Sequence, residues 1–292
     1  MPDAFDGVPL WILKATVLAL GATFGSFANV VIYRLPLGRS IVYPGSACAK
    51  CETPIKWFDN IPVISYMLLL GKCRVCKEPI SIRYPLIELS GAVLSLACLL
   101  LAINVGFEVA DLAGLAVLWA FFFAFCFLLL VITFIDLEHW WIPPSLVLPG
   151  IAIGLLTNIL LGDLTGVSWL DALIGMVAGG LPIWLIRVLY FKIRGHEGMG
   201  LGDVFLMAMV GAMLGYVALP FVLLAASIQG LIVAIPLSLK KKIADPPWEP
   251  EEGHEHQETM GKTAVPFGPF IALGALQWLF FGDAIAALLF QF

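Results

Sequence analysis

Two aspartates beside long apolar segments are the first residues of this sequence that could do chemistry together. Asp136 follows the apolar run 112–135, and Asp203 follows Gly200 and Gly202 in the string Gly-Leu-Gly-Asp. Two neighbouring carboxyl groups can share one proton, so that the ionised group takes a proton from water while the protonated group polarises a carbonyl. This is the chemistry of an aspartic protease. The two glycines would permit tight turns and close approach of an extended peptide.

Each aspartate also has a structural interpretation. Aspartate is a common N-cap residue, which would account for Asp203 at the start of a helix. Asp136 could be a charge at the membrane boundary that reaches water. The residues alone leave these interpretations open, because a single G-x-G-D string is short.

Four cysteines form a second candidate site. Cys48 and Cys51 are followed, after 21 residues, by Cys73 and Cys76. Two C-x-x-C pairs at this separation are close to the zinc-ribbon pattern, in which each pair places two thiolates about 2.3 Å from a tetrahedral ion. The metal would also stabilise a segment too small to fold by apolar burial alone. Two disulfides or free thiols are the alternatives, and a reducing cytoplasm disfavours disulfides.

The elements that must position these residues are membrane-spanning helices. The chain has 292 residues, 61% of them hydrophobic and 13% charged, against about 45–50% and about 25% in soluble domains. This composition excludes an ordinary cytosolic globule, a disordered chain and a nucleic-acid binder built on a basic face. Apolar runs span residues 8–32, 86–103, 112–135, 146–161, 169–191, 204–217, 219–239 and 266–290. The sequence therefore predicts an all-α polytopic membrane protein with about eight transmembrane helices. The sixth and seventh are joined almost without a loop, so a fold with one fewer span is the alternative.

The expected domain organisation is a first helix at 1–33, a four-cysteine insert at 34–84 and a helix bundle at 85–292. A loop at 240–263 within the bundle, rich in Pro, Glu and His, is expected to be mobile and solvated, although His254 and His256 could bind metal. Threading eight helices places every Lys and Arg except Lys14 on one side, and short cytoplasmic loops are enriched in these residues. Both termini are therefore expected on the outer side of the membrane, with Asp136 and Asp203 at the cytoplasmic boundary.

Together these motifs resemble those of the type IV prepilin leader peptidases, polytopic aspartic proteases of the G-x-G-D class. The matching segments are 25–36, the double C-x-x-C insert with 57–62 and 83–88, the Asp136 segment, 197–203 and 266–269. The resemblance implies that Asp136 and Asp203 are the catalytic pair. It further suggests that Gly200, Gly202 and Glu197 support the catalytic loop.

The resemblance also implies a substrate, a reaction and a location. The substrate would be a prepilin or pseudopilin of a type IV pilus or type II secretion system, cleaved after a glycine on the cytoplasmic side of the bacterial inner membrane. Many members of the family also methylate the new N-terminal amine with S-adenosylmethionine, so a bifunctional enzyme is expected. No residue can be assigned to that cofactor, although Glu88 is given either a structural or a methylation-linked role. Pro144 and Phe205 depart from the family pattern.

Three other hypotheses remain. The chain could be a peptidase without methyltransferase activity, an ion-coupled transporter with a zinc regulatory insert, or an inactive scaffold for pilus assembly. Transporters often show internal repeats or broken helices at mid-membrane. This sequence has no convincing repeat, and its two acids are expected at one boundary. Membrane lipid is an expected partner and nucleic acid is not.

Overall fold

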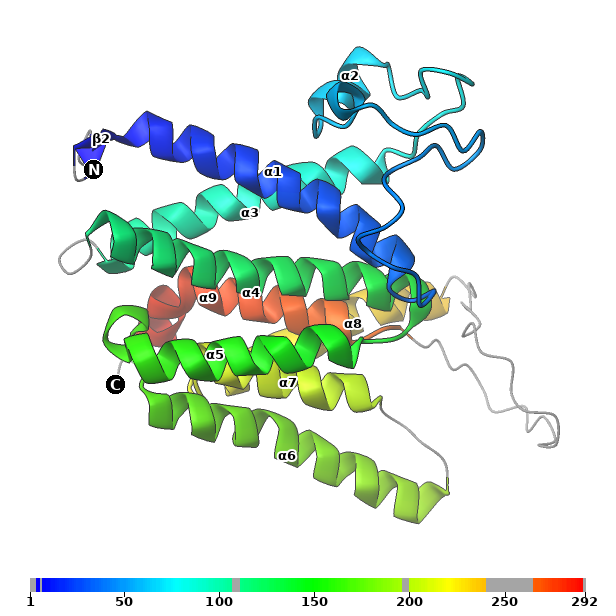
Figure 1. Ribbon diagram of the computed structural model, residues 1–292. Coiled ribbons are helices and arrows are strands. Elements are labelled where there is room, and N and C mark those ends of the chain that lie inside the picture. The colour runs from blue at the N-terminus through cyan, green and yellow to red at the C-terminus, as the bar shows by residue number, and fades with distance from the viewer. Residues whose placement is uncertain (1–3, 6, 107–110, 196–199, 240–264, 291–292) are drawn as a thin grey trace. The chain divides into compact units, whose positions relative to one another are not determined.

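The described residues of the protein are almost entirely helical. A computed structural model describes residues 4, 5, 7–106, 111–195, 200–239 and 265–290. Glu197, His254, His256 and the loop at 240–263 lie outside these residues. Figure 1 shows the long helices, which are α1 (Leu10–Arg34), α3 (Arg83–Gly106), α4 (Leu112–His139), α5 (Pro144–Thr165), α6 (Trp169–Arg194), α7 (Leu201–Leu214), α8 (Ala218–Leu239) and α9 (Gly268–Phe290). The predicted helical membrane fold is confirmed.

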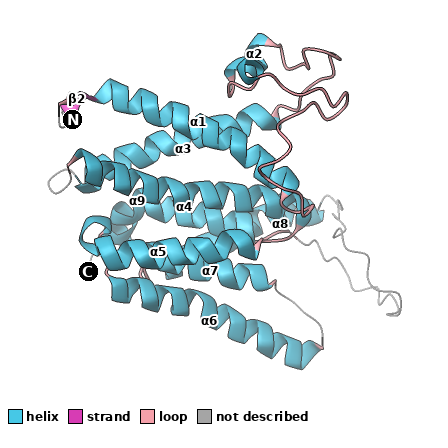
Figure 2. Ribbon diagram, viewed as in Figure 1, coloured by secondary structure: helices cyan, strands magenta, loops and turns pink. Residues whose placement is uncertain are grey.

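The smaller elements lie before α1 and between α1 and α3. Strands β1 (Ala4–Phe5) and β2 (Val8–Pro9) form a short antiparallel pair. The insert contains a 3-10 helix (Trp57–Asp59) and the short helix α2 (Ile64–Leu68). Figure 2 shows that the rest of the insert is loop. A segment with so little regular structure needs contacts other than helix packing to hold its shape.

Seven of the described helices are long and apolar enough to cross a membrane, so the protein is a multi-pass membrane protein. The exception is α7, which has 14 residues and is therefore about 21 Å long, whereas the hydrocarbon core is about 30 Å thick. Gly215, with φ +77°, ends this helix. All residues from Leu206 to Met213 are buried. The sixth apolar run is therefore a short, enclosed helix instead of a full-length span.

The chain divides into two compact units, Met1–Val131 and Ile132–Phe292, with the boundary inside α4. In the first unit, α1 and α3 pack through glycines. A Cβ on Gly25 would lie 2.7 Å from the Cα of Glu88, and one on Gly91 would lie 2.5 Å from the carbonyl oxygen of Gly21. Small residues at such crossings let helix backbones touch, which is how membrane helices associate without a hydrophobic driving force.

In the second unit, α7 is the core element and packs against α5 and α6. A Cβ on Gly211 would overlap the carbonyl group of Gly175 in α6. On the other side, the buried amide of Asn158 in α5 donates to the carbonyl oxygen of Ala212 at 2.9 Å. Because all its faces are packed, α7 holds its first turn in a defined position, and that turn carries Asp203.

Candidate active site and metal centre

Asp136 lies near the end of α4 and is buried, with 5% of its surface exposed. This burial argues against the interpretation of Asp136 as a boundary charge that reaches water. The chain turns sharply after α4, where Trp140 has φ +54°. Helix α5 then starts with Pro143 as its N-cap and Pro144 in its first turn. Proline is favoured at this place because its missing N–H would be unpaired in any case, so Pro144 helps to begin α5.

Asp203 lies in the first turn of α7, and the N-cap of this helix is Gly200. The interpretation of Asp203 as an N-cap is therefore wrong. Gly202, beside it, packs against the turn between α4 and α5, because a Cβ on Gly202 would lie 2.6 Å from the Cβ of Ile142. The G-x-G-D string thus brings Asp203 against the segment that follows Asp136.

A third segment completes this cluster. The backbone N–H of Gly268, the first residue of α9, donates to Oδ2 of Asp136 at 3.0 Å. A Cβ on Gly268 would lie 2.5 Å from the same oxygen and 3.1 Å from Cδ1 of Ile142. The ends of four helices, α4, α5, α7 and α9, therefore meet around Ile142. The carboxyl groups of Asp203 and Asp136 are near enough to interact electrostatically.

Two of these contacts were not identified from the sequence. The sequence marks the segment 266–269 as a motif, but it indicates no role for Gly268 or Ile142. The only sequence signal of Gly268 is its position between two prolines, in Pro266-Phe-Gly-Pro269. That pattern does not say which group the backbone N–H would meet 132 residues away.

The four cysteines of the insert form one cluster. The sulfurs of Cys48 and Cys76 are 3.7 Å apart, those of Cys51 and Cys73 are 4.0 Å apart, and all four lie within 4.8 Å of one another. Four ligands about 2.3 Å from a tetrahedral ion are about 3.8 Å from each other, whereas disulfide sulfurs are about 2.05 Å apart. All six cysteines, every one of them described, are free. The cluster could therefore bind one metal ion.

Two similar turns build this cluster. The N–H of Cys48 donates to the carbonyl of Thr53, and the N–H of Cys73 donates to the carbonyl of Glu78. Each turn has a residue at positive φ directly after its second cysteine, Glu52 at +55° or Lys77 at +61°. The two C-x-x-C strings therefore fold into matching loops that present their sulfurs to a common point.

The charge on the sulfurs also favours a bound cation. Hydrogen bonds from the side chain and backbone of Thr53 lower the pKa of Cys51 to about 6. The backbone N–H of Glu78 favours the thiolate of Cys76, but desolvation and the neighbouring sulfurs raise the pKa of Cys76 to about 12. Four thiolates this close would repel one another, so a divalent ion at their centre would be needed to hold all four in the ionised form.

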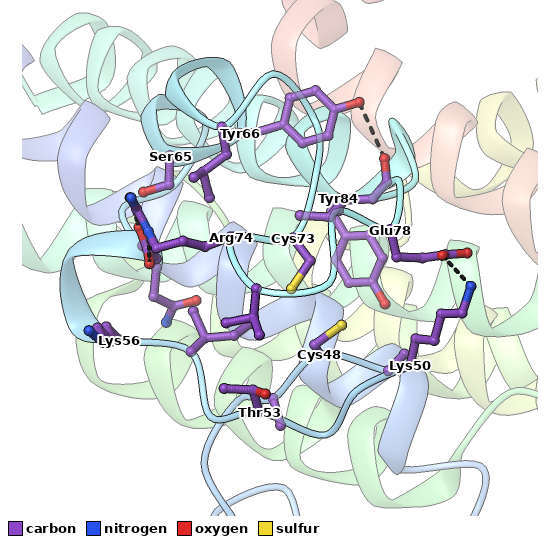
Figure 3. A pocket seen from close by; sticks show the side chains of 18 of the residues that line it. Cys48, Lys50, Thr53, Lys56, Ser65, Tyr66, Cys73, Arg74, Glu78 and Tyr84 are labelled. Carbon is purple, nitrogen blue, oxygen red and sulfur yellow. Dashed lines mark hydrogen bonds and ion pairs between the residues drawn. The ribbon is translucent and has the colours of Figure 1, made fainter.

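A cavity of about 620 Å³ lies beside the cysteines. Its lining includes two ion pairs, Arg74 with Asp59 and Lys50 with Glu78. The guanidinium of Arg74 donates to both Asp59 oxygens, at 2.7 and 2.5 Å, and holds the pKa of Asp59 below its ordinary value. Figure 3 shows these pairs on opposite sides of the view. Glu88 also lines the cavity.

Comparisons with known proteins agree with these features. Residues 19–102 match the model of the bacterial peptidase A24 N-terminal domain, and residues 122–235 match that of the type IV leader peptidase family. A prepilin leader peptidase/N-methyltransferase of Aeromonas hydrophila is 36% identical, covering 96% of this chain and 94% of the relative. Proteins with the same description from Myxococcus xanthus strain DK1622 and Burkholderia pseudomallei strain 1026b are 33% and 35% identical, covering 94% and 98% of this chain and 91% of each relative. No solved structure matches this chain. The chain belongs to the type IV leader peptidase family.

Proposed function

We propose that this protein is an inner-membrane aspartic endopeptidase that removes the leader of a prepilin or pseudopilin and methylates the new N-terminal amine. The descriptions of the relatives support both activities. The single observation that carries the peptidase assignment is the cluster around Ile142, where Gly202, the neighbour of Asp203, and Gly268, whose N–H donates to Asp136, pack against the same side chain.

The hydrogen bond from Gly268 divides the roles of the two aspartates. An N–H directed at Oδ2 stabilises negative charge on Asp136. When the pair holds one proton, Asp136 is therefore the carboxylate and Asp203 carries the proton. Asp136 takes a proton from the attacking water while Asp203 donates a hydrogen bond to the scissile carbonyl. The water oxygen bonds to the carbonyl carbon, and the carbon–nitrogen bond then breaks as Asp136 passes the proton taken from water to the leaving amine.

Single amide substitutions test this assignment. Asp136→Asn and Asp203→Asn remove one ionisable group each with little change of shape, and each should slow leader removal about 10²–10⁴-fold, the usual contribution of a positioned acid or base. Purified variants in proteoliposomes are incubated with a prepilin, and the products are weighed by mass spectrometry. Asp283→Asn, on the exposed surface of α9, is the matched control and should cleave normally. Full cleavage by either of the first two variants would refute the pair.

The same product masses test the methyltransferase assignment and the competing hypotheses. With S-adenosylmethionine present, the mature pilin should gain the mass of one methyl group in place of a hydrogen. Cleavage without that gain supports a peptidase alone. No cleavage by the unaltered protein would favour the scaffold or the transporter.

Zinc is the metal that we propose for the four cysteines. Four thiolates in tetrahedral positions are a common structural zinc site. Since the insert carries many of the cationic residues, it is assigned to the cytoplasm, with the active site on the same side and both termini in the periplasm. Zinc measured in the purified protein should equal one ion per chain.

A further inference from the structure

The short helix α2 of the insert presents apolar side chains to its surroundings. Ile64, Met67 and Leu68 recur at the spacing of one helical face, and they are 55%, 68% and 77% exposed. Leu70, shortly after the helix, is 84% exposed. A surface helix of a soluble domain has the opposite arrangement, with its apolar residues inside and its polar residues outside. The apolar face of α2, formed by Ile64, Met67 and Leu68, is therefore built for contact with something other than water.

Hydrogen bonds hold the other side of α2 against the insert. Ser65 is buried, and its hydroxyl donates to the carbonyl of Phe58 at 3.0 Å and accepts the N–H of Ile61 at 3.1 Å. The hydroxyl of Tyr66 donates to the carbonyl of Ile80 at 3.3 Å, as the dashed line at Tyr66 in Figure 3 shows. These bonds fix the rotation of α2 about its axis, so the exposure of its apolar face is a defined feature of the fold.

Both ends of α2 are tied to the start of a membrane-spanning helix. The N–H of Val63, directly before α2, donates to the carboxyl group of Glu88 in α3 at 2.6 Å. After α2, the carbonyl of Gly71 accepts the N–H of Ile80 at 2.7 Å, three residues before α3 begins. The apolar span of α3 is Arg83–Val105, so Glu88 is only about 7.5 Å along the helix axis from its first residue. The membrane surface is therefore within reach of the apolar face of α2.

The charges around α2 favour a lipid partner. The segment 61–71 contains no charged residue, and Lys56 and Lys72 lie on its two sides in the chain. The carboxylate of Asp59, between Lys56 and this segment, is paired with Arg74. About ten uncharged residues are too few to cross a bilayer and are typical of an interfacial segment. Lysines beside such a segment attract anionic lipid headgroups.

We propose that the apolar face of α2 lies in the interfacial region of the lipid bilayer and anchors the insert to the membrane surface beside α3. Helices with one apolar face bind membranes in this way, with that face at the boundary of headgroups and acyl chains. Trp57, in the 3-10 helix that packs on α2, is 81% exposed and is of a residue type enriched in the same region. Because α1 and α3 tether the insert to the bilayer, a small apolar face is enough for binding. This inference does not depend on the proposed activities.

Photolabelling from the lipid side tests this contact in the whole protein. The purified protein, supplied with zinc, is reconstituted in vesicles of phosphatidylethanolamine and phosphatidylglycerol that contain a phospholipid with a diazirine near the headgroup end of one acyl chain. Trypsin cleaves after lysine, so α2 is recovered within the single peptide 57–72. After illumination, mass spectrometry should find lipid on this peptide and none on peptide 51–56, which belongs to the first C-x-x-C loop.

A matched pair of variants shows whether the apolar face makes the contact. Leu68→Glu should lower the labelling of peptide 57–72 about tenfold, because the burial of one leucine side chain shifts a binding equilibrium by at least about this factor. Val42→Glu adds the same charge at an aliphatic residue that is 83% exposed in the loop after α1, and it should leave the labelling of α2 unchanged. The zinc content of both variants should equal that of the unaltered protein, because neither side chain is buried.

A photoreactive side chain on the face identifies its partner directly. With p-benzoylphenylalanine in place of Met67, the main adduct in these vesicles should be phospholipid, whereas the same group in place of the exposed Glu52 should capture none. Cross-linking from position 67 to a second copy of the chain, or to a prepilin added to the vesicles, would identify a protein-docking surface and overturn the proposal. The proposal is also wrong if peptide 57–72 of the unaltered protein carries no lipid, or if Leu68→Glu is labelled as strongly as the unaltered protein.

Discussion

Gly268 offers a sharp test of how the proposed active site is built, because any side chain there would meet an oxygen of Asp136, which we propose as a catalytic residue. A Cβ on Gly268 would lie 2.5 Å from Oδ2 of Asp136. That is about 0.9 Å closer than the 3.4 Å at which ordinary van der Waals contact begins. The carboxyl group or the start of α9 must move by about this amount, and either movement lengthens the 3.0 Å hydrogen bond from the Gly268 N–H.

The expected effect is on the chemical step. A misplacement of about 1 Å at reacting groups can cost about 10²-fold in rate, so Gly268→Ala should lower kcat for leader removal about 100-fold. Because Gly268 acts by positioning Asp136, its substitution should change KM much less than kcat. The rates are measured in proteoliposomes with a prepilin substrate over a range of concentrations.

The matched control is another glycine of the same helix. A Cβ on Gly282 would lie 3.4 Å from its nearest neighbour, Trp278. Gly282→Ala should therefore leave kcat unchanged. Thermal unfolding of both variants checks that the fold is intact. If Gly268→Ala cleaved at the normal rate with an unaltered melting temperature, the role given to the Gly268 N–H would be wrong.

Two further predictions concern stability and metal. Gly211→Ala should destabilise the protein by about 1–3 kcal/mol or more, because its Cβ would overlap the backbone of Gly175; Gly230→Ala, whose Cβ would lie 3.5 Å from the Phe270 ring, is the control in thermal unfolding. Cys48→Ser should lower the zinc content and make the insert more susceptible to trypsin. Removal of zinc by a chelator should have the same effect, because the free energy of metal binding contributes to the folding of the insert. Cys98→Ala, in α3 and outside the cluster, should keep its zinc, and an unchanged zinc content in Cys48→Ser would contradict the metal assignment.

Sequence reasoning predicted the helices well because lipid imposes a simple rule. Long apolar runs in a membrane form helices, since every backbone polar group must be paired internally. Long helices such as α4 and α6 therefore appear near their predicted ends. The same rule does not decide whether the sixth run is a span, because α7 is apolar but is enclosed by other helices and ended by Gly215. Apolar composition does not distinguish burial in lipid from burial in protein.

The candidate sites differ in how far the sequence could locate them. The four cysteines lie in two short, repeated strings, so local turn geometry is enough to bring each pair together. The contact between Gly268 and Asp136 depends instead on how α4 and α9 pack, and no local pattern encodes it. The cavity beside the cysteines is harder still, because Glu88 is separated from Cys48 by 40 positions in the chain. The cysteines have a local signature, whereas the contacts of Gly268 and Ile142 depend on long-range packing and were not predicted.

The glycines of the second unit connect the stability of this protein to its chemistry. Gly175 and Gly211 let α6 and α7 approach until their backbones touch, and this contact fixes the position of α7 along α6. Gly202 then presses the first turn of the same helix against Ile142, which Gly268 meets from α9. A displacement of α7 at its far end would therefore be transmitted to Asp203 along a rigid helix. For this reason Gly211→Ala should slow cleavage even below its melting temperature, whereas Gly230→Ala should change neither property.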